Sequence, residues 1–130
     1  PPDIGIYTLN AFIASDYIIV PMIPERLSLE GYQQLQEKVE IVQDMGVNVE
    51  IMGAVITLFQ GRLAVHEEWR EQIAKGFGDR LLGVIHAAAE MKRLSETKQL
   101  LTESTRSQRV YLEHLKLTQK IASVLGVDFS

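Results

Sequence analysis

The 130-residue sequence contains no cysteine, and this absence excludes several kinds of chemistry. A disulfide framework, a thiolate metal site and a cysteine nucleophile all require the missing thiol. The sequence also lacks a run of about 18 apolar residues and a signal-like basic and apolar start, so we expect neither a membrane span nor secretion. A chain without cysteine fits a reducing compartment, and we expect a cytoplasmic protein.

Excess positive charge is also absent, because 17 acidic and 13 basic residues give a net charge of −4. This balance argues against a strongly basic nucleic-acid-binding protein but leaves room for a local basic patch. The sequence is 46% hydrophobic and 23% charged, which is typical of a globular domain rather than of disorder. We therefore expect residues 1–130 to form a single domain or a fragment of one.

The chain begins with Pro1-Pro2-Asp3 and has no initiator methionine. A globular domain rarely starts with paired prolines immediately before a helical segment. We therefore expect the sequence to be the C-terminal part of a longer protein.

Apolar spacing predicts helices that alternate with strands. The predicted helices span residues 4–15, 28–45, 65–77, 93–101 and 107–125, and the predicted strands span 17–21, 49–58 and 81–85. This order predicts an α/β fold with a parallel sheet and helices on both faces. Such sheets bind ligands beyond the carboxyl ends of their strands, which here follow Pro21, Leu58 and Ile85.

Three local features refine this prediction. Residues 17–21 are apolar without alternation, which is typical of a strand buried on both faces. Ser28 is expected to cap the helix that follows. Residues 59–62 are expected to form a turn after the second strand.

Motifs of known catalytic sites are missing. The sequence contains neither G-x-x-x-x-G-K-[ST] nor G-x-G-x-x-G, so it has no phosphate-binding loop of its own. It also lacks a G-x-S-x-G elbow, which argues against hydrolases of that kind. His66, His86 and His114 lack metal-ligand spacing, so we expect surface or hydrogen-bonded histidines. We predict no metal site and no catalytic residue within these 130 residues.

Basic residues allow two interpretations. The final helix region carries Arg106, Arg109, Lys116 and Lys120. Such a helix could lie on a membrane surface, but its basic face is sparse, which favours packing on the sheet. A second set could contact phosphates only if the fold brings its members together: Arg62, Lys92, Arg93 and Arg106.

The first third of the chain carries a more specific pattern. Residues 1–5 contain two prolines and a glycine, Asn10-Ala11 lies on the next helix, and a strand ends at residues 19–21. Glu25 and Leu29-Glu30-Gly31 follow. This ungapped spacing closely resembles the ParA/Soj family of partition ATPases, which belong to the deviant Walker-motif group of P-loop proteins.

Later segments resemble the same family more loosely. Residues 56–62 are similar to its strand-end segment, although Gln60 stands where an acid is common. Residues 77–80 match its Phe-Gly-Asp segment, and residues 93–96 match Arg-Leu-Ser-Glu. His86-Ala87 replaces the usual Pro-Arg, which leaves part of the base pocket or DNA face in question.

The resemblance implies that the chain is the C-terminal half of a P-loop NTPase domain and assigns roles to three sets of residues. The switch segment near the γ-phosphate would comprise Pro1, Pro2, Asp3, Ile4 and Gly5. The nucleotide or dimer face would include Glu25, Thr57, Phe59 and His86. Candidates for contacting DNA are Arg62, Lys92 and Arg93.

The resemblance also implies a function in plasmid or chromosome partitioning. The intact parent would use ATP and Mg²⁺, form a homodimer on non-specific DNA and respond to a ParB-like adaptor. It would be cytoplasmic and nucleoid-associated, without a membrane partner. Two alternatives stay open: a MinD-like division-site ATPase, and a non-enzymatic α/β interaction module that lacks the P-loop.

The missing P-loop yields a first prediction. Because the P-loop and Mg²⁺ ligands supply most of the charge stabilisation in phosphoryl transfer, the purified 130-residue chain should neither bind ATP tightly nor hydrolyse it. A phosphate-release assay measures the hydrolysis, with a buffer blank as control. Turnover above that blank would contradict the prediction.

Overall fold

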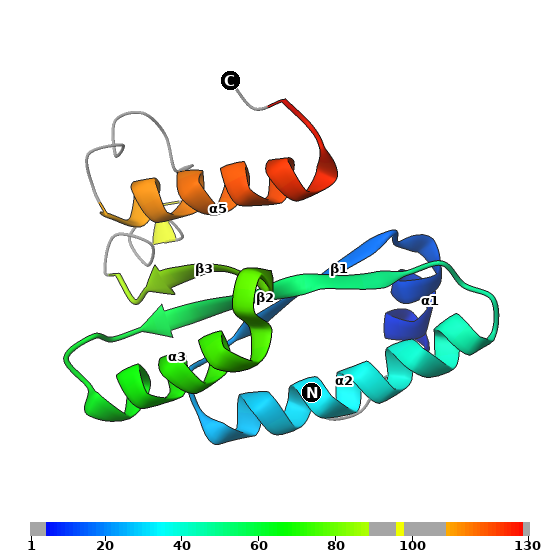
Figure 1. The fold of residues 1–130 in the computed structure, drawn as a ribbon, viewed down its shortest axis with the longest axis horizontal. Helices are drawn as coiled ribbons and strands as arrows, with labels where there is room; N and C mark the ends of the chain where they lie inside the picture. The colour runs from blue at the N-terminus through cyan, green and yellow to red at the C-terminus, as the bar shows by residue number, and fades with distance from the viewer. Residues whose placement is uncertain (1–4, 89–95, 98–108, 129–130) are drawn as a thin grey trace.

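The computed structural model describes residues 5–88, 96–97 and 109–128, and these form an α/β fold with a parallel sheet. Three strands lie in the order β1-β2-β3, and helices cover both faces (Figure 1). The elements are α1 (Ile6–Ala14), β1 (Tyr17–Met22), α2 (Arg26–Asp44), β2 (Glu50–Phe59), α3 (Ala64–Phe77), the 3-10 helix η1 (Gly78–Arg80), β3 (Leu81–His86) and α5 (Arg109–Leu125). The predicted fold class is therefore confirmed.

The sheet separates two helical layers. Helices α2 and α3 lie along one face, and α5 lies across the other (Figure 1). On the first face, Met22, Ile56 and Ile73 join one buried cluster, and α1 adds Phe12 to a neighbouring cluster. On the second face, Leu117 and Ile121 of α5 pack against four buried strand residues: Met52, Val55, Leu82 and Ile85.

The ends of several elements differ from the prediction. Helix α2 begins at Arg26 rather than Ser28, and Glu25 is its N-cap residue without a side-chain capping bond. Phe59 ends β2 instead of opening a turn, because it still pairs with His86. Of the helix predicted over residues 93–101, only Glu96 and Thr97 are described.

In the sheet formed by the described residues, β1 is an edge strand and one of its faces is partly exposed, so its predicted burial on both faces is wrong. Val20 and Met22 face the α2 layer, whereas the side chains of Tyr17 and Ile19 are 43% and 37% exposed. Among the described residues, α5 covers the β3 side of that second face and leaves β1 open. Pro21 stays within the strand because an edge position does not need its missing N–H.

Strand β2 occupies the centre and is buried over residues 52–56. Gly53 lies so close to η1 that an added Cβ atom would be 2.1 Å from the carbonyl oxygen of Arg80. Here glycine is required for close backbone approach rather than for its dihedral freedom. By contrast, a Cβ atom at Gly31, on the exposed face of α2, would meet nothing within 4 Å.

These two glycines generate a matched stability prediction. Gly53→Ala should lower the free energy of unfolding by about 2 kcal/mol or more, because rigid backbone must move. Gly31→Ala should raise it by about 0.5–1 kcal/mol, since alanine favours a helix. Urea denaturation measures both values. Equal stability of the two variants would contradict the assigned packing.

The open side of β1 generates a prediction about association. An exposed apolar edge strand favours pairing with another chain, so the purified protein should self-associate as its concentration rises. Ile19→Lys should shift it toward the monomer, because a charged edge side chain opposes strand pairing. Size-exclusion chromatography with light scattering gives the mass, and circular dichroism checks the fold. A strictly monomeric unmodified chain would refute this expectation.

Candidate functional site

An open groove of about 750 Å³ lies at the carboxyl ends of β2 and β3. Residues 58–62 form one wall, residues 86–88 form another, and Arg109 of α5 completes the lining. Parallel α/β sheets place their ligand sites at such strand ends, because the connecting loops there converge. The groove is therefore the principal candidate site.

Phe59 joins the groove to the core. Its side chain is only 4% exposed, and its ring meets the His86 ring edge-on at 5.0 Å between centroids. The His66 ring lies 6.1 Å from Phe59, and the Arg70 guanidinium lies 5.8 Å from the centre of the Phe59 ring. An arginine at this distance is attracted by the ring's electrons.

Arg70 also pairs with Glu67 one turn earlier on α3. Its Nε donates to Glu67 Oε1 at 3.1 Å, and Nη2 contacts the same oxygen. The hydrogen bond from Arg70 lowers the pKa of Glu67, and the same contact raises the pKa of Arg70. Both side chains are partly exposed, so this pair orients Arg70 more than it stabilises the fold.

The second polar pair links two distant parts of the chain. The Glu113 carboxylate of α5 accepts the backbone N–H of His86 at 3.0 Å and lies 2.5 Å from the ring Nδ1 of that residue. The side chains of His86 and Glu113 are 24% and 15% exposed. This contact ties α5 to the end of β3, where His86 lines the groove.

Backbone strain also occurs at the groove. Leu58 has a φ of +54°, and it is the only described non-glycine residue with a positive φ. The register of β2 against β3 shifts between Ile56 and Phe59. The backbone N–H of Ala87 then donates to the Phe59 carbonyl at 2.9 Å, so this irregular end is fixed by hydrogen bonding. Such outliers often mark functional sites.

Several residues named from the sequence come together here. Phe59, His86 and Arg62 all line the groove, although the first two were assigned to the nucleotide face and the third to DNA. Glu25 is the N-cap residue of α2, and Thr57 is half-buried within β2; neither lines the groove. The assigned roles stay predictions.

The remaining named residues lie elsewhere. Gly5 is the exposed N-cap residue of α1. Seven others lie outside the described residues: Pro1, Pro2, Asp3, Ile4, Lys92, Arg93 and Arg106.

The sequence pattern does not indicate that Arg109 and Glu113 belong at this site. Arg109 is one of several basic residues on the final helix, and Glu113 lies among them. Glu113 follows Val110 by three residues and precedes Leu117 by four, so it belongs to the inward stripe of α5. A charged residue within an apolar stripe was the available signal.

The three histidines behave as expected from their spacing. The Nδ1 atom of His66 accepts the Gln60 N–H at 3.0 Å, and His114 Nδ1 lies 2.7 Å from the Val110 carbonyl. His86 pairs with Glu113. Within the described ranges, no three His, Cys, Asp or Glu side chains are grouped so that they could hold a metal ion.

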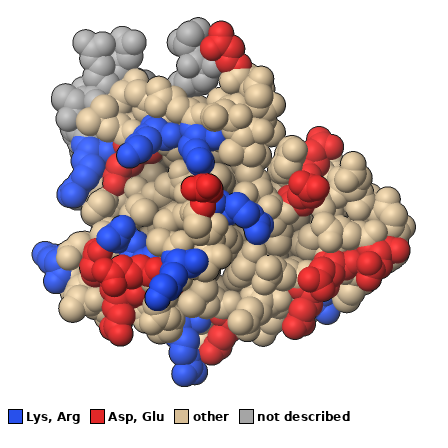
Figure 2. Space-filling model, viewed as in Figure 1, with Lys and Arg blue, Asp and Glu red and all other residues tan. Residues whose placement is uncertain are grey.

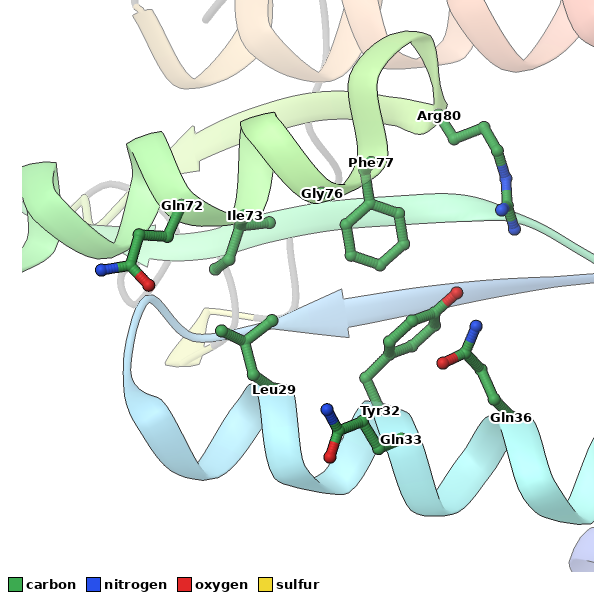
Figure 3. Close-up of a pocket in the computed structure, with 9 residues that line it drawn as sticks. All are labelled: Leu29, Tyr32, Gln33, Gln36, Gln72, Ile73, Gly76, Phe77 and Arg80. Atoms are coloured by element: carbon green, nitrogen blue, oxygen red, sulfur yellow. The ribbon is translucent and has the colours of Figure 1, made fainter.

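A second cavity of about 320 Å³ lies between α2 and α3 (Figure 3). Tyr32 and Phe77 meet there with ring centroids 4.7 Å apart. Three amide side chains surround them: Gln33, Gln36 and Gln72. Arg80 at one end donates to the Ile51 carbonyl at 2.8 Å. This cavity is a seam between packed helices rather than a strand-end site.

Charge is distributed unevenly over the surface. Figure 2 shows Lys and Arg side chains over α5 and a band of Asp and Glu side chains along α2. The basic side chains of α5 are Arg109, Lys116 and Lys120. The acidic side chains of α2 are Glu30, Glu37, Glu40 and Asp44. In the described part of the chain, no helix is long and apolar enough to cross a membrane.

The chain is similar in sequence to known proteins. A family model described as an AAA domain matches residues 1–52. The chain is 30% identical over 123 residues to the sporulation initiation inhibitor protein Soj of Bacillus subtilis, covering 89% of this chain and 48% of that protein. It is 31% identical over 86 residues to the chromosome partitioning protein ParA of Caulobacter vibrioides, covering 65% and 32% respectively. The resemblance to the ParA/Soj family is confirmed.

A solved structure shares the fold of this chain. A crystal structure described as a plasmid partition protein of Borrelia burgdorferi B31, bound to AMPPNP, matches with a TM-score of 0.71 and 23% identity. The match covers 89% of this chain and 44% of that one, and it supports the fold alone. The chain spans about a third to a half of the length of the curated ParA and Soj relatives it matches.

Proposed function

We propose that this chain forms the switch and strand-end part of a ParA-like ATPase for plasmid or chromosome partitioning. The observation that carries the proposal is the similarity to Soj over 89% of the chain, together with the parallel α/β fold. In this proposal, residues 1–5 form the switch next to the γ-phosphate. Paired prolines suit such a segment because they limit the backbone to a few defined states.

ATP with Mg²⁺ is the proposed cofactor of the whole protein. The groove volume lies within the usual range for ligand pockets, and Phe59 and His86 provide aromatic rings beside it. These residues fit a nucleotide base. The 130 residues contain no P-loop motif, so this chain contributes the base side of the site rather than the phosphate cradle. Bound ATP supplies the phosphoryl group for hydrolysis.

The charge distribution supports a DNA-binding role near the same end of the sheet. Arg62 and Arg109 come from different parts of the chain and line one groove, and α5 carries two further lysines. Two arginines along one groove suit contact with the phosphates of DNA, independent of sequence. Lys92 and Arg93 are proposed to extend this contact.

The proposed partners follow from the same role. A homodimer would place two basic surfaces on one DNA molecule, and non-specific DNA contact would give a nucleoid-associated, cytoplasmic protein. A ParB-like adaptor would regulate the ATPase.

One alternative has an observation in its favour. A non-enzymatic α/β interaction module would keep this fold without a phosphate-binding loop, as this sequence does. The two proposals differ in whether the chain should bind DNA, because an interaction module does not require two arginines along one groove.

The DNA role predicts a specific effect of the two groove arginines. A fluorescein-labelled duplex of random sequence should bind the protein with an affinity that falls as salt rises. The double variant Arg62→Ala/Arg109→Ala should weaken binding and reduce the logarithmic salt slope by about two, one for each phosphate contact. Fluorescence anisotropy measures both quantities.

The matched control is Arg26→Ala on the acidic helix α2. Arg26 is an exposed arginine whose Nε lies 3.2 Å from Glu30, and it does not line the groove. This variant should bind DNA like the unmodified protein. An equal loss in both variants, or no loss in the double variant, would reject the groove as the DNA contact.

A further inference from the structure

The carboxylate of Glu113 determines which ring nitrogen of His86 carries a proton. It accepts the backbone N–H of His86 and lies 2.5 Å from the ring Nδ1. An ionised carboxylate can only accept hydrogen bonds, so Nδ1 must be the donor. The neutral ring therefore has its proton on Nδ1 and a free lone pair on Nε2.

The lone pair on Nε2 is available to a ligand. Nε2 forms no hydrogen bond with any other described residue, and the His86 side chain lines the groove. The edge-on contact with the Phe59 ring and the Ala87-to-Phe59 backbone bond hold this segment in place. His86 thus has one unused hydrogen-bond acceptor beside the groove, and a few polar groups of this kind give a pocket its specificity.

We propose that His86, oriented by Glu113, makes this groove select adenine over guanine. Adenine carries an exocyclic amino group that donates a hydrogen bond, whereas guanine carries a carbonyl oxygen at the equivalent ring position. The amino group would donate to His86 Nε2. The guanine oxygen would instead face another lone pair. The proposal rests on the proposed function in one respect, that the groove holds a nucleotide base.

The first experiment measures base preference with adenosine and guanosine. These nucleosides carry no phosphate, so their binding does not require a P-loop. Titration of the 130-residue chain at pH 8, followed by NMR shifts of the His86 and Phe59 signals, should show adenosine binding about fivefold or more tightly, as one neutral hydrogen bond would give. Equal binding of the two nucleosides, or binding of neither, would overturn the proposal.

The second experiment reverses the hydrogen-bond direction with Glu113→Gln. The backbone N–H of His86 can only donate, so the oxygen of the introduced amide must face it and the amide NH₂ must face Nδ1. The ring proton then moves to Nε2, which becomes a donor. This variant should lose the preference for adenosine and bind guanosine more tightly instead.

Histidine ¹⁵N shifts report the ring tautomer directly and separate this positioning role from a merely structural one. The unmodified chain should show protonated Nδ1, and Glu113→Gln should show protonated Nε2. Glu68→Gln, a change on α3 at a residue that does not line the groove, is the matched control and should alter neither tautomer nor preference. A Glu113→Gln variant with an unchanged amide spectrum and an unchanged tautomer would refute the role of Glu113.

His86→Phe keeps an aromatic ring beside Phe59 and removes the acceptor. It should bind the two nucleosides with equal affinity, and a persisting preference for adenosine would reject His86 as the selecting group. Equal nucleoside binding by the unmodified chain, together with salt-dependent DNA binding, would reject the base selection while leaving the partition function standing. Adenosine selection by a chain that does not bind DNA would support the base selection and reject the partition function.

Discussion

Burial of the central strand β2 is the constraint on which the rest of the structure depends. Its residues 52–56 are buried, and they contribute to apolar clusters on both faces of the sheet. A strand covered on two sides cannot place polar side chains along its length, so polar groups are confined to its ends. The carboxyl end is where Phe59, Gln60 and Arg62 emerge next to the end of β3. The position of the groove thus follows from the burial of one strand.

The Glu113–His86 contact fixes helix α5 relative to that groove. It joins residues 27 apart in the sequence, and each side chain is mostly buried. A partly buried carboxylate needs hydrogen-bond donors, and the end of β3 supplies two from a single residue. Helix α5 is therefore fixed to the strand end by polar geometry as well as by its apolar contacts with the sheet. This arrangement brings Arg109 of the same helix to the groove that Arg62 also lines.

Charged side chains divide the described surface into an acidic side and a basic side. Helix α2 carries a band of acidic residues, whereas basic residues lie over α5 (Figure 2), and Arg62 and Arg109 both line the strand-end groove. In the proposed role, DNA would approach the second side, because the acidic residues of the first side repel phosphates. The net charge of −4 therefore describes neither side, because acidic and basic residues are separated in space. The similarity to ParA and Soj proteins and this separation of charge both support the proposed function.

The sequence by itself determined the long helices, the strands and their order, because apolar spacing reflects local backbone geometry. Its ungapped pattern over the first third also indicated the family. It misjudged β1, since apolar composition is the same for a central strand and for an edge strand with an open face. Only the tertiary structure decided which residues share the candidate site. The pairing of Glu113 with His86, and the presence of Arg62 and Arg109 along one groove, depend on how α5 packs on the sheet, and sequence spacing carries no information about that packing.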